Sequence, residues 1–214
     1  MTGKAARGEV KYFSPRQRPL DGCKGVSPYS NQLTIRIRLS TDEEHALKIL
    51  VAVDRKPTSA AAIQAAAQIA ERLRAELAVI TVRSGTHATE TPPPVGVDIP
   101  TQDRSSLPDG LRILLQAADT LAASGHLNPV TRIKLRDLPY GHVFFAQKTS
   151  GERMLFSERF GSLVDELNHE IAENQFDLVV IAAPRRGPLG RFAPMNIPRK
   201  LALDLHCSFL VVRG

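Results

Sequence analysis

Short apolar runs of strand length alternate with longer amphipathic stretches from residue 47 onward. A continuous apolar run indicates a strand buried on both faces, and apolar residues at helical spacing indicate a helix with one buried side. The runs predict five strands, at 47–53, 76–82, 129–137, 177–183 and 207–213. Helical spacing between them predicts four helices, at 60–76, 111–124, 161–175 and 198–206.

This alternation predicts an α/β fold, with a five-stranded parallel sheet and helices on both faces. Crossovers between parallel strands are right-handed. Ligands of such sheets bind beyond the carboxyl ends of the strands, where the strand order reverses. With the order 3-2-1-4-5, this point lies between the first and fourth strands. Asp54, which ends the first strand, then faces the loop at 184–191.

The first 45 residues differ in composition from the rest of the chain. Residues 1–32 are rich in Gly, Pro, Ser and Arg and show no period, which predicts irregular structure. Residues 33–40, LTIRIRLS, alternate apolar and polar positions and predict an additional edge strand, whose outward arginines discourage stray pairing. We therefore divide the chain into a basic N-terminal extension, 1–45, and a folded domain, 46–214.

Two segments lengthen the folded domain beyond the simple alternation. Residues 84–109 are rich in Pro, Thr and Ser and are long for a connection, so they are interpreted as a loop insertion. In residues 138–160, HVFFAQ and RMLFSERF flank KTSGE, a pattern that predicts an inserted β-hairpin or a strand extension.

The net charge of +6 belongs to the N-terminal extension. Residues 1–40 contain eight Lys and Arg against two acidic residues, and the remaining residues are balanced. Such a tail can contact nucleic acid, anionic lipid or an acidic partner. No interleaving of aromatic and basic residues indicates base stacking, so we expect a solvated extension and no nucleic-acid binding.

The two cysteines, Cys23 and Cys207, match no metal-binding or redox spacing, which fits a reducing compartment. No apolar run approaches the length of a membrane span. The first residues lack the apolar core of a signal peptide. We therefore expect a cytoplasmic protein.

No constellation of residues predicts catalysis. The six histidines are scattered, and zinc, Walker A and GxSxG spacings are absent. Asp165, Glu166 and Glu170 lie close together on the predicted third helix, where their spacing favours a solvated face. Cys207 is interpreted as a buried small hydrophobic residue. We expect no enzyme activity and no metal site.

The first and last parts of the folded domain resemble the universal stress protein family. The resemblance rests on LKILVAVDRKPTSAAAIQAAAQIAERLRAELAVITV and FDLVVIAAPRRGPLGRFAPMNIPRKLALDLHCSFLVVRG, and it covers roughly 46–83, 110–136 and 161–214. The family implies the strand order 3-2-1-4-5, dimers made through the last strand, and an ATP site in some members.

The ATP-binding branch of that family carries a glycine motif after the fourth strand: Gly, two residues, Gly, nine residues, then Gly and Ser or Thr. Glycines let the backbone approach phosphates, and the N–H groups hold them. An ungapped alignment puts other residues at these four positions: Ala182, Arg185, Met195 and Asn196. The resemblance therefore implies that ATP is not held in the family's usual way.

Two features are nevertheless compatible with a bound ligand. Asp54 matches the family position that contacts the adenine end, although an Asp that ends a strand also stops it and caps the next turn. Arg185, Arg186 and Arg191 can replace backbone N–H groups with guanidinium groups, which bind phosphate well, or form a solvated basic loop. Together with Ala182 and Asn196, these residues define the candidate pocket.

Three hypotheses follow. The first is a non-catalytic regulatory or binding protein of the universal stress type, dimeric through residues 208–213, with no cofactor. The second keeps an adenine nucleotide, ATP included, or another phosphorylated ligand on Asp54 and the loop arginines. The third is an accessory subunit that docks onto a larger assembly through residues 1–45 and 138–160.

Overall fold

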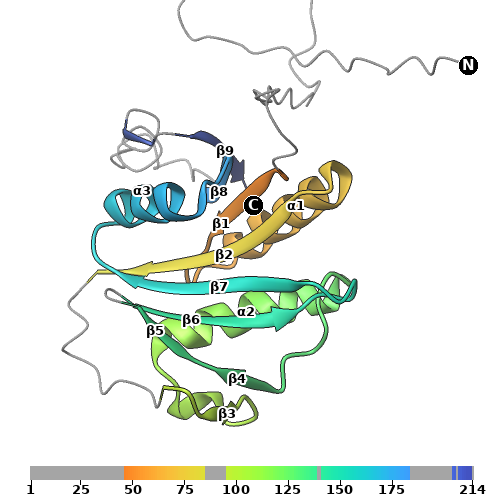
Figure 1. Ribbon diagram of the computed structural model, residues 1–214, viewed down its shortest axis with the longest axis vertical. Helices are drawn as coiled ribbons and strands as arrows, with labels where there is room; N and C mark the ends of the chain where they lie inside the picture. Colours follow the sequence, from red (N-terminus) through yellow and green to blue (C-terminus); the bar gives the residue numbers. More distant parts are fainter. Residues whose placement is uncertain (1–45, 85–94, 139–140, 184–203, 206, 214) are drawn as a thin grey trace, which may run out of the picture. The chain divides into compact units, whose positions relative to one another are not determined.

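The computed structural model describes residues 46–84, 95–138, 141–183, 204–205 and 207–213 (Figure 1). All of them belong to the compact unit His45–Gly214. The edge strand predicted at 33–40 lies outside the described residues, and so does most of the helix predicted at 198–206.

The described part of the chain contains a run of strands interrupted by three α-helices and a short 3₁₀ helix. The elements before residue 125 are β1 Lys48–Ala52, α1 Thr58–Leu73, β2 Glu76–Arg83, β3 Asp98–Pro100, η2 Arg104–Ser106 and α2 Asp109–Ala123. The elements after it are β4 Arg132–Lys134, β5 Arg136–Leu138, β6 Gly141–Gln147, β7 Arg153–Phe160, α3 Leu163–Asn174, β8 Leu178–Ala183 and β9 Ser208–Arg213.

Seven of the strands form one sheet in the order β5-β6-β7-β2-β1-β8-β9 (Figure 1). The five strands from β7 to β9 pair in parallel, so the predicted order 3-2-1-4-5 is confirmed with β7 as the third strand. Strands β6 and β5 extend this sheet by antiparallel pairing. Strands β3 and β4 form a separate two-stranded sheet.

The position predicted for the third parallel strand, 129–137, is wrong. That segment splits into β4 and β5, and neither strand pairs with β2. A hairpin forms within the predicted range 138–160, but it is not an insertion, because its second strand, β7, takes the place beside β2. The physical reason is burial, because β7 contributes Phe156 and Met154 to the core. Residues 132–136 instead alternate exposed basic and buried apolar positions, a pattern typical of a sheet with one face exposed to solvent.

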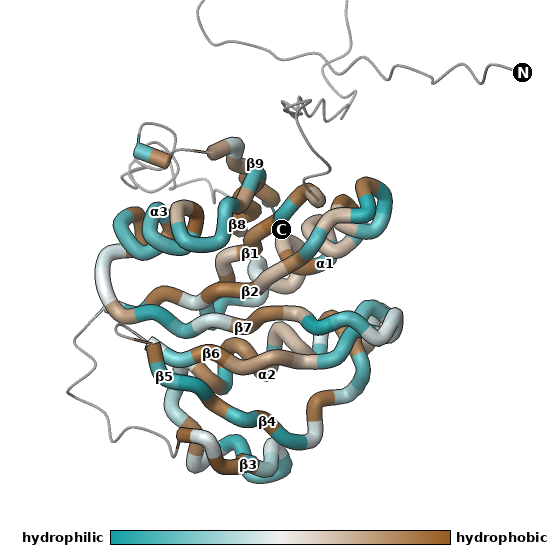
Figure 2. The backbone as a smooth tube through the Cα atoms, viewed as in Figure 1, coloured by the Kyte–Doolittle hydropathy of each residue, from teal (hydrophilic) through white to brown (hydrophobic). Residues whose placement is uncertain are grey.

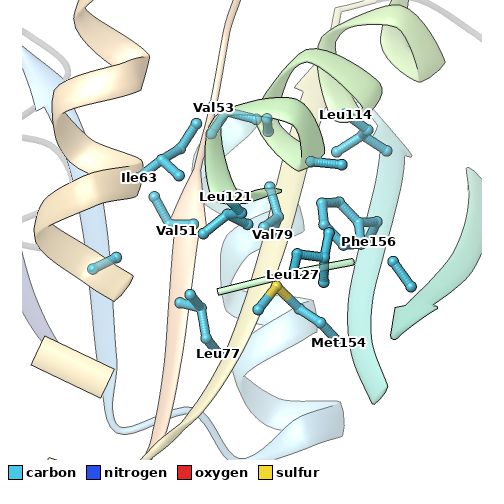
Figure 3. Packing of buried hydrophobic residues seen from close by; sticks show 14 of the residues in the cluster. Val51, Val53, Ile63, Leu77, Val79, Leu114, Leu121, Leu127, Met154 and Phe156 are labelled. Carbon is cyan, nitrogen blue, oxygen red and sulfur yellow. The ribbon is translucent and has the colours of Figure 1, made fainter. Parts of the chain in front are cut away.

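The sheet separates two hydrophobic clusters. Along β1, Ile49, Val51 and Val53 point toward α1 and α2, whereas Leu50 and Ala52 point toward α3. This alternation follows from the two-residue period of a strand. Figure 3 shows the first cluster, in which side chains from β1, β2 and β7 meet those of α1 and α2.

The larger cluster extends past the sheet edge. Leu107, Leu127, Ile133 and Leu135 are all buried in the same cluster as the apolar side chains of α2. The cluster therefore includes Ile133 of the small β3–β4 sheet. Hydrophobic residues concentrate on the central strands and hydrophilic ones on β5 and the outer turns of α3 (Figure 2). No helix among the described residues is long and apolar enough to cross a membrane.

Candidate ligand site at the carboxyl edge of the sheet

The parallel strands end at one edge of the sheet, and this edge carries the predicted site. Ala52 of β1 pairs with Ile181 of β8, so Asp54, just after β1, and Ala182, near the end of β8, lie at neighbouring strand ends where the strand order reverses. Ala182 is half-buried against the larger hydrophobic cluster. The other predicted pocket residues, Arg185, Arg186, Arg191 and Asn196, lie outside the described residues, and their roles stay predictions.

The carboxylate of Asp54 is bound by its own loop. Its Oδ1 atom accepts a hydrogen bond of 2.7 Å from the Ser59 hydroxyl and one of 2.9 Å from the Lys56 backbone N–H. Its Oδ2 atom lies 3.3 Å from Lys56 Nζ. The Ser59 hydroxyl also accepts a 3.0 Å bond from the Asp54 backbone N–H. The chain thus forms an Asx turn that leads into α1.

These contacts set the charge of Asp54. Partial burial acts to raise the pKa of its carboxyl group, but the bonds from Ser59 and Lys56 and the charge of Lys56 outweigh it. The net effect is a pKa below the ordinary value of 3.8. Asp54 is therefore ionised at neutral pH, and both of its oxygens are already engaged within the loop.

A second polar cluster lies at the start of α2, and sequence reasoning missed it. Asp109 forms ion pairs with Arg55 and Arg112, and Arg83 Nη2 lies 4.0 Å from Asp109 Oδ2. We call these four residues the Asp109 cluster. Arg55 comes from the loop after β1, and Arg83 ends β2. Sequence spacing relates Asp109 only to Arg112, three residues later on α2, and the fold alone brings Arg55 and Arg83 to them.

Beneath the Asp109 cluster lies the fully buried Glu158 of β7. Its Oε1 atom is 3.6 Å from Arg83 Nη1. Gly110, in the first turn of α2, approaches this carboxylate closely, and the positive end of the helix dipole favours a negative charge there. On the next strand, His142 pairs across from Glu158 and places Nδ1 3.0 Å from Asp137 Oδ1.

The opposite face of β7 carries a buried ion pair. Arg159 donates from Nε to Glu170 Oε2 at 2.8 Å and from Nη2 to Glu173 Oε2 at 2.6 Å. The predicted solvated face of α3 is therefore wrong for Glu170 and Glu166, which are both buried. The pKa of Glu170 is raised by burial, which outweighs the opposing effect of Arg159. A buried acid on this helix needs a cation from β7, and sequence spacing within the helix cannot reveal that partner.

Two further kinds of site, a metal centre and a reactive thiol, can be checked among the described residues. No cluster of three or more His, Cys, Asp or Glu within the described ranges is placed to hold a metal ion. Cys207 is half-buried, and burial raises the pKa of its thiol to about 11. The thiolate that acts as a nucleophile is therefore scarce at neutral pH.

A model of the universal stress protein family matches residues 46–213. The chain belongs to this family. No match was found among curated proteins.

Several solved structures resemble the chain, at low sequence identity. A universal stress protein in complex with cAMP is 19% identical, with 78% of this chain and 97% of that one covered and a TM-score of 0.48. UspA from Lactobacillus plantarum is 20% identical, with 80% and 100% covered and a TM-score of 0.47. The Archaeoglobus fulgidus universal stress protein in complex with dAMP is 16% identical, with 77% and 96% covered and a TM-score of 0.44.

Proposed function

We propose that this chain is a non-catalytic binding or regulatory protein of the universal stress type that does not hold ATP in the way of the family's ATP-binding branch. The observation that carries the proposal is the state of Asp54. Its Oδ1 atom is bonded to Ser59 and Lys56, and its Oδ2 atom faces Lys56 Nζ. A ligand that uses this carboxylate competes with contacts that Asp54 already makes within its own loop.

The sequence after β8 supports the same proposal. Ala182, Arg185 and Met195 stand where the ATP-binding branch has glycines. Each side chain adds bulk at a position where a backbone N–H would approach a phosphate. Asn196, at the fourth position, keeps a polar side chain.

The proposal includes a cytoplasmic homodimer. Strand β9 stands at one end of the sheet as far as the structure describes it, and an apolar edge strand requires a covering partner. Sedimentation equilibrium should give a mass twice that of the 23.4 kDa chain. A single species of monomer mass at all concentrations would remove the dimer from the proposal.

Bound nucleotide tests the proposed loss of the ATP site. The protein is purified, denatured and centrifuged, and the supernatant is chromatographed against ATP and AMP. Because solved relatives are described with cAMP and dAMP, both serve as further standards. We expect no stoichiometric nucleotide. Nucleotide that co-purifies with the wild type and is lost in Asp54→Ala would contradict the proposal.

A further inference from the structure

Three guanidinium groups converge on a single carboxylate in the Asp109 cluster. Asp109 Oδ2 pairs with Arg55 Nη2 and has Arg83 Nη2 at 4.0 Å, while Asp109 Oδ1 pairs with Arg112 Nη2. The arginines come from three elements: the loop after β1, the end of β2 and α2. One carboxylate thus occupies a position built from three separate parts of the fold.

The surroundings favour an anion at this position. Asp109 begins α2, where the helix dipole stabilises negative charge. The buried Glu158 lies beside Arg83 as a second acid, so three arginines gather around two acids at this place. The position also lies at the carboxyl edge of the parallel sheet, where ligands of such folds bind.

The occupying carboxylate is held loosely enough to be exchanged. The side chains of Arg55 and Arg112 are 63% and 46% exposed, and that of Asp109 is 26% exposed. Because Arg55 and Arg112 are exposed, water screens their ion pairs with Asp109 and these pairs contribute little to stability. Displacing Asp109 from these two arginines therefore costs the fold little.

We infer that Arg55, Arg83 and Arg112 form a binding site for the phosphoryl group of a small molecule, and that Asp109 occupies it when the ligand is absent. A phosphate group carries more negative charge and more acceptor oxygens than a carboxylate, and guanidinium groups bind it through paired N–H donors. An incoming phosphoryl group takes the place of the Asp109 carboxylate. None of these residues lies in the loop after β8, so the site is independent of the proposed loss of ATP binding.

Replacement of the occupying carboxylate tests the inference. Wild type, Asp109→Asn and Asp109→Ser are titrated calorimetrically with inorganic phosphate and with AMP, at constant ionic strength. When a side chain of the protein occupies the site, the apparent affinity for a ligand equals the intrinsic affinity multiplied by the fraction of time that the site is free. We expect both variants to bind phosphate about fivefold tighter than the wild type, or more. Circular dichroism shows which of the two variants is folded. If Asp109→Asn is unfolded, the titration relies on Asp109→Ser, because serine is favourable at a helix start.

Helix α2 provides a matched control. Asp119, further along α2, accepts a 3.0 Å hydrogen bond from Arg104 of η2, and Asp119→Asn makes the same change of charge. We expect no gain in affinity from it. Asp109→Asn combined with Arg55→Gln should lose the gain, and Arg55 is exposed enough to be replaced without unfolding the protein.

The outcomes separate the alternatives. Equal gains for phosphate and AMP assign the site to the phosphoryl group alone, and a larger gain for AMP assigns it to the phosphate of a nucleotide. No gain in either Asp109 variant, an equal gain in Asp119→Asn, or a gain that survives Arg55→Gln would each overturn the inference. AMP binding that is abolished by Asp54→Ala but unchanged by substitution of Asp109 or Arg55 would contradict the proposed function. The same result would overturn the inference of a phosphoryl site at the Asp109 cluster.

Discussion

Gly110 in the first turn of α2 and the buried Glu158 of β7 are packed so closely that a Cβ atom at position 110 would overlap Glu158 Oε1. Glu158 is fully buried, so its carboxylate has no solvent into which to move. The small side chain at position 110 thus lets the start of the helix lie over a buried acid.

Gly110→Ala should destabilise the protein by about 1–3 kcal/mol, because overpacking forces side chains and backbone to shift. Ordinarily the same change inside a helix stabilises it by about 0.5–1 kcal/mol, so the sign itself is informative. Urea denaturation measures the free energy of unfolding. In a Glu158→Ala background, Gly110→Ala should cost much less, and an equal cost in both backgrounds would show that the two residues are not coupled.

The pair Arg159–Glu170 should be far more sensitive to replacement than the neighbouring pair Arg159–Glu173. Arg159→Met leaves the buried Glu170 without its cation, which should cost about 3–5 kcal/mol. Glu173 is 60% exposed, so Glu173→Gln should cost less than about 1 kcal/mol. Adding Glu170→Gln to Arg159→Met should recover much of the loss. Denaturation curves that rank the three variants otherwise would refute this account of the pair.

Asp54 should make the folded state sensitive to acid. Its pKa in the folded protein lies below the ordinary value of 3.8, so below that value the unfolded chain binds more protons than the folded one. The contribution is present above about pH 3.8 and is lost as the pH falls through the folded pKa. The free energy of unfolding of Asp54→Asn should therefore fall less steeply with acid than that of the wild type. Parallel slopes would show that the Ser59 and Lys56 contacts do not favour the charged form.

Cys207 should react slowly with thiol reagents. Because its pKa is about 11, the thiolate fraction at pH 7 is far lower than that of an ordinary cysteine with a pKa of about 8.5. The measurement uses Cys23→Ser, which leaves Cys207 as the remaining thiol of the chain. The rate of disulfide exchange should rise with pH well beyond pH 9 in the folded protein and approach that of a free thiol after denaturation. A rate that levels off near pH 8.5 in the folded state would contradict the raised pKa.

Sequence analysis predicted the parallel strands that are apolar on both faces. It placed the third strand at 129–137, whereas the strand beside β2 is β7, whose second half is polar. Runs such as 47–53 and 177–183 are continuous because helices cover both sides of the sheet. Strand β7 carries Ser157, Glu158 and Arg159 in its second half, a polar pattern that suggests a peripheral hairpin. Glu158 and Arg159 are buried because Arg83, Glu170 and Glu173 come from other elements to pair with them.

The candidate site could likewise be predicted only in part from the sequence. Asp54 follows directly from its place after an apolar run. The bonds that engage its carboxylate come from Ser59 and Lys56, close in sequence, and an Asp that caps the next turn is one of the two sequence readings. The Asp109 cluster joins Arg55, Arg83 and Asp109 across more than fifty residues of chain, so only the fold reveals it.

Calorimetric titration of ATP into the wild type and Asp54→Ala tests the central claim most directly. We predict that any heat of ATP binding is the same for the two proteins when both are folded, because the site proposed at Arg55, Arg83 and Arg112 does not include Asp54. Saturable binding at one site per chain in the wild type, abolished by Asp54→Ala, would show that Asp54 leaves Ser59 and Lys56 to hold the nucleotide, and the account of an ATP site lost from this chain would be wrong.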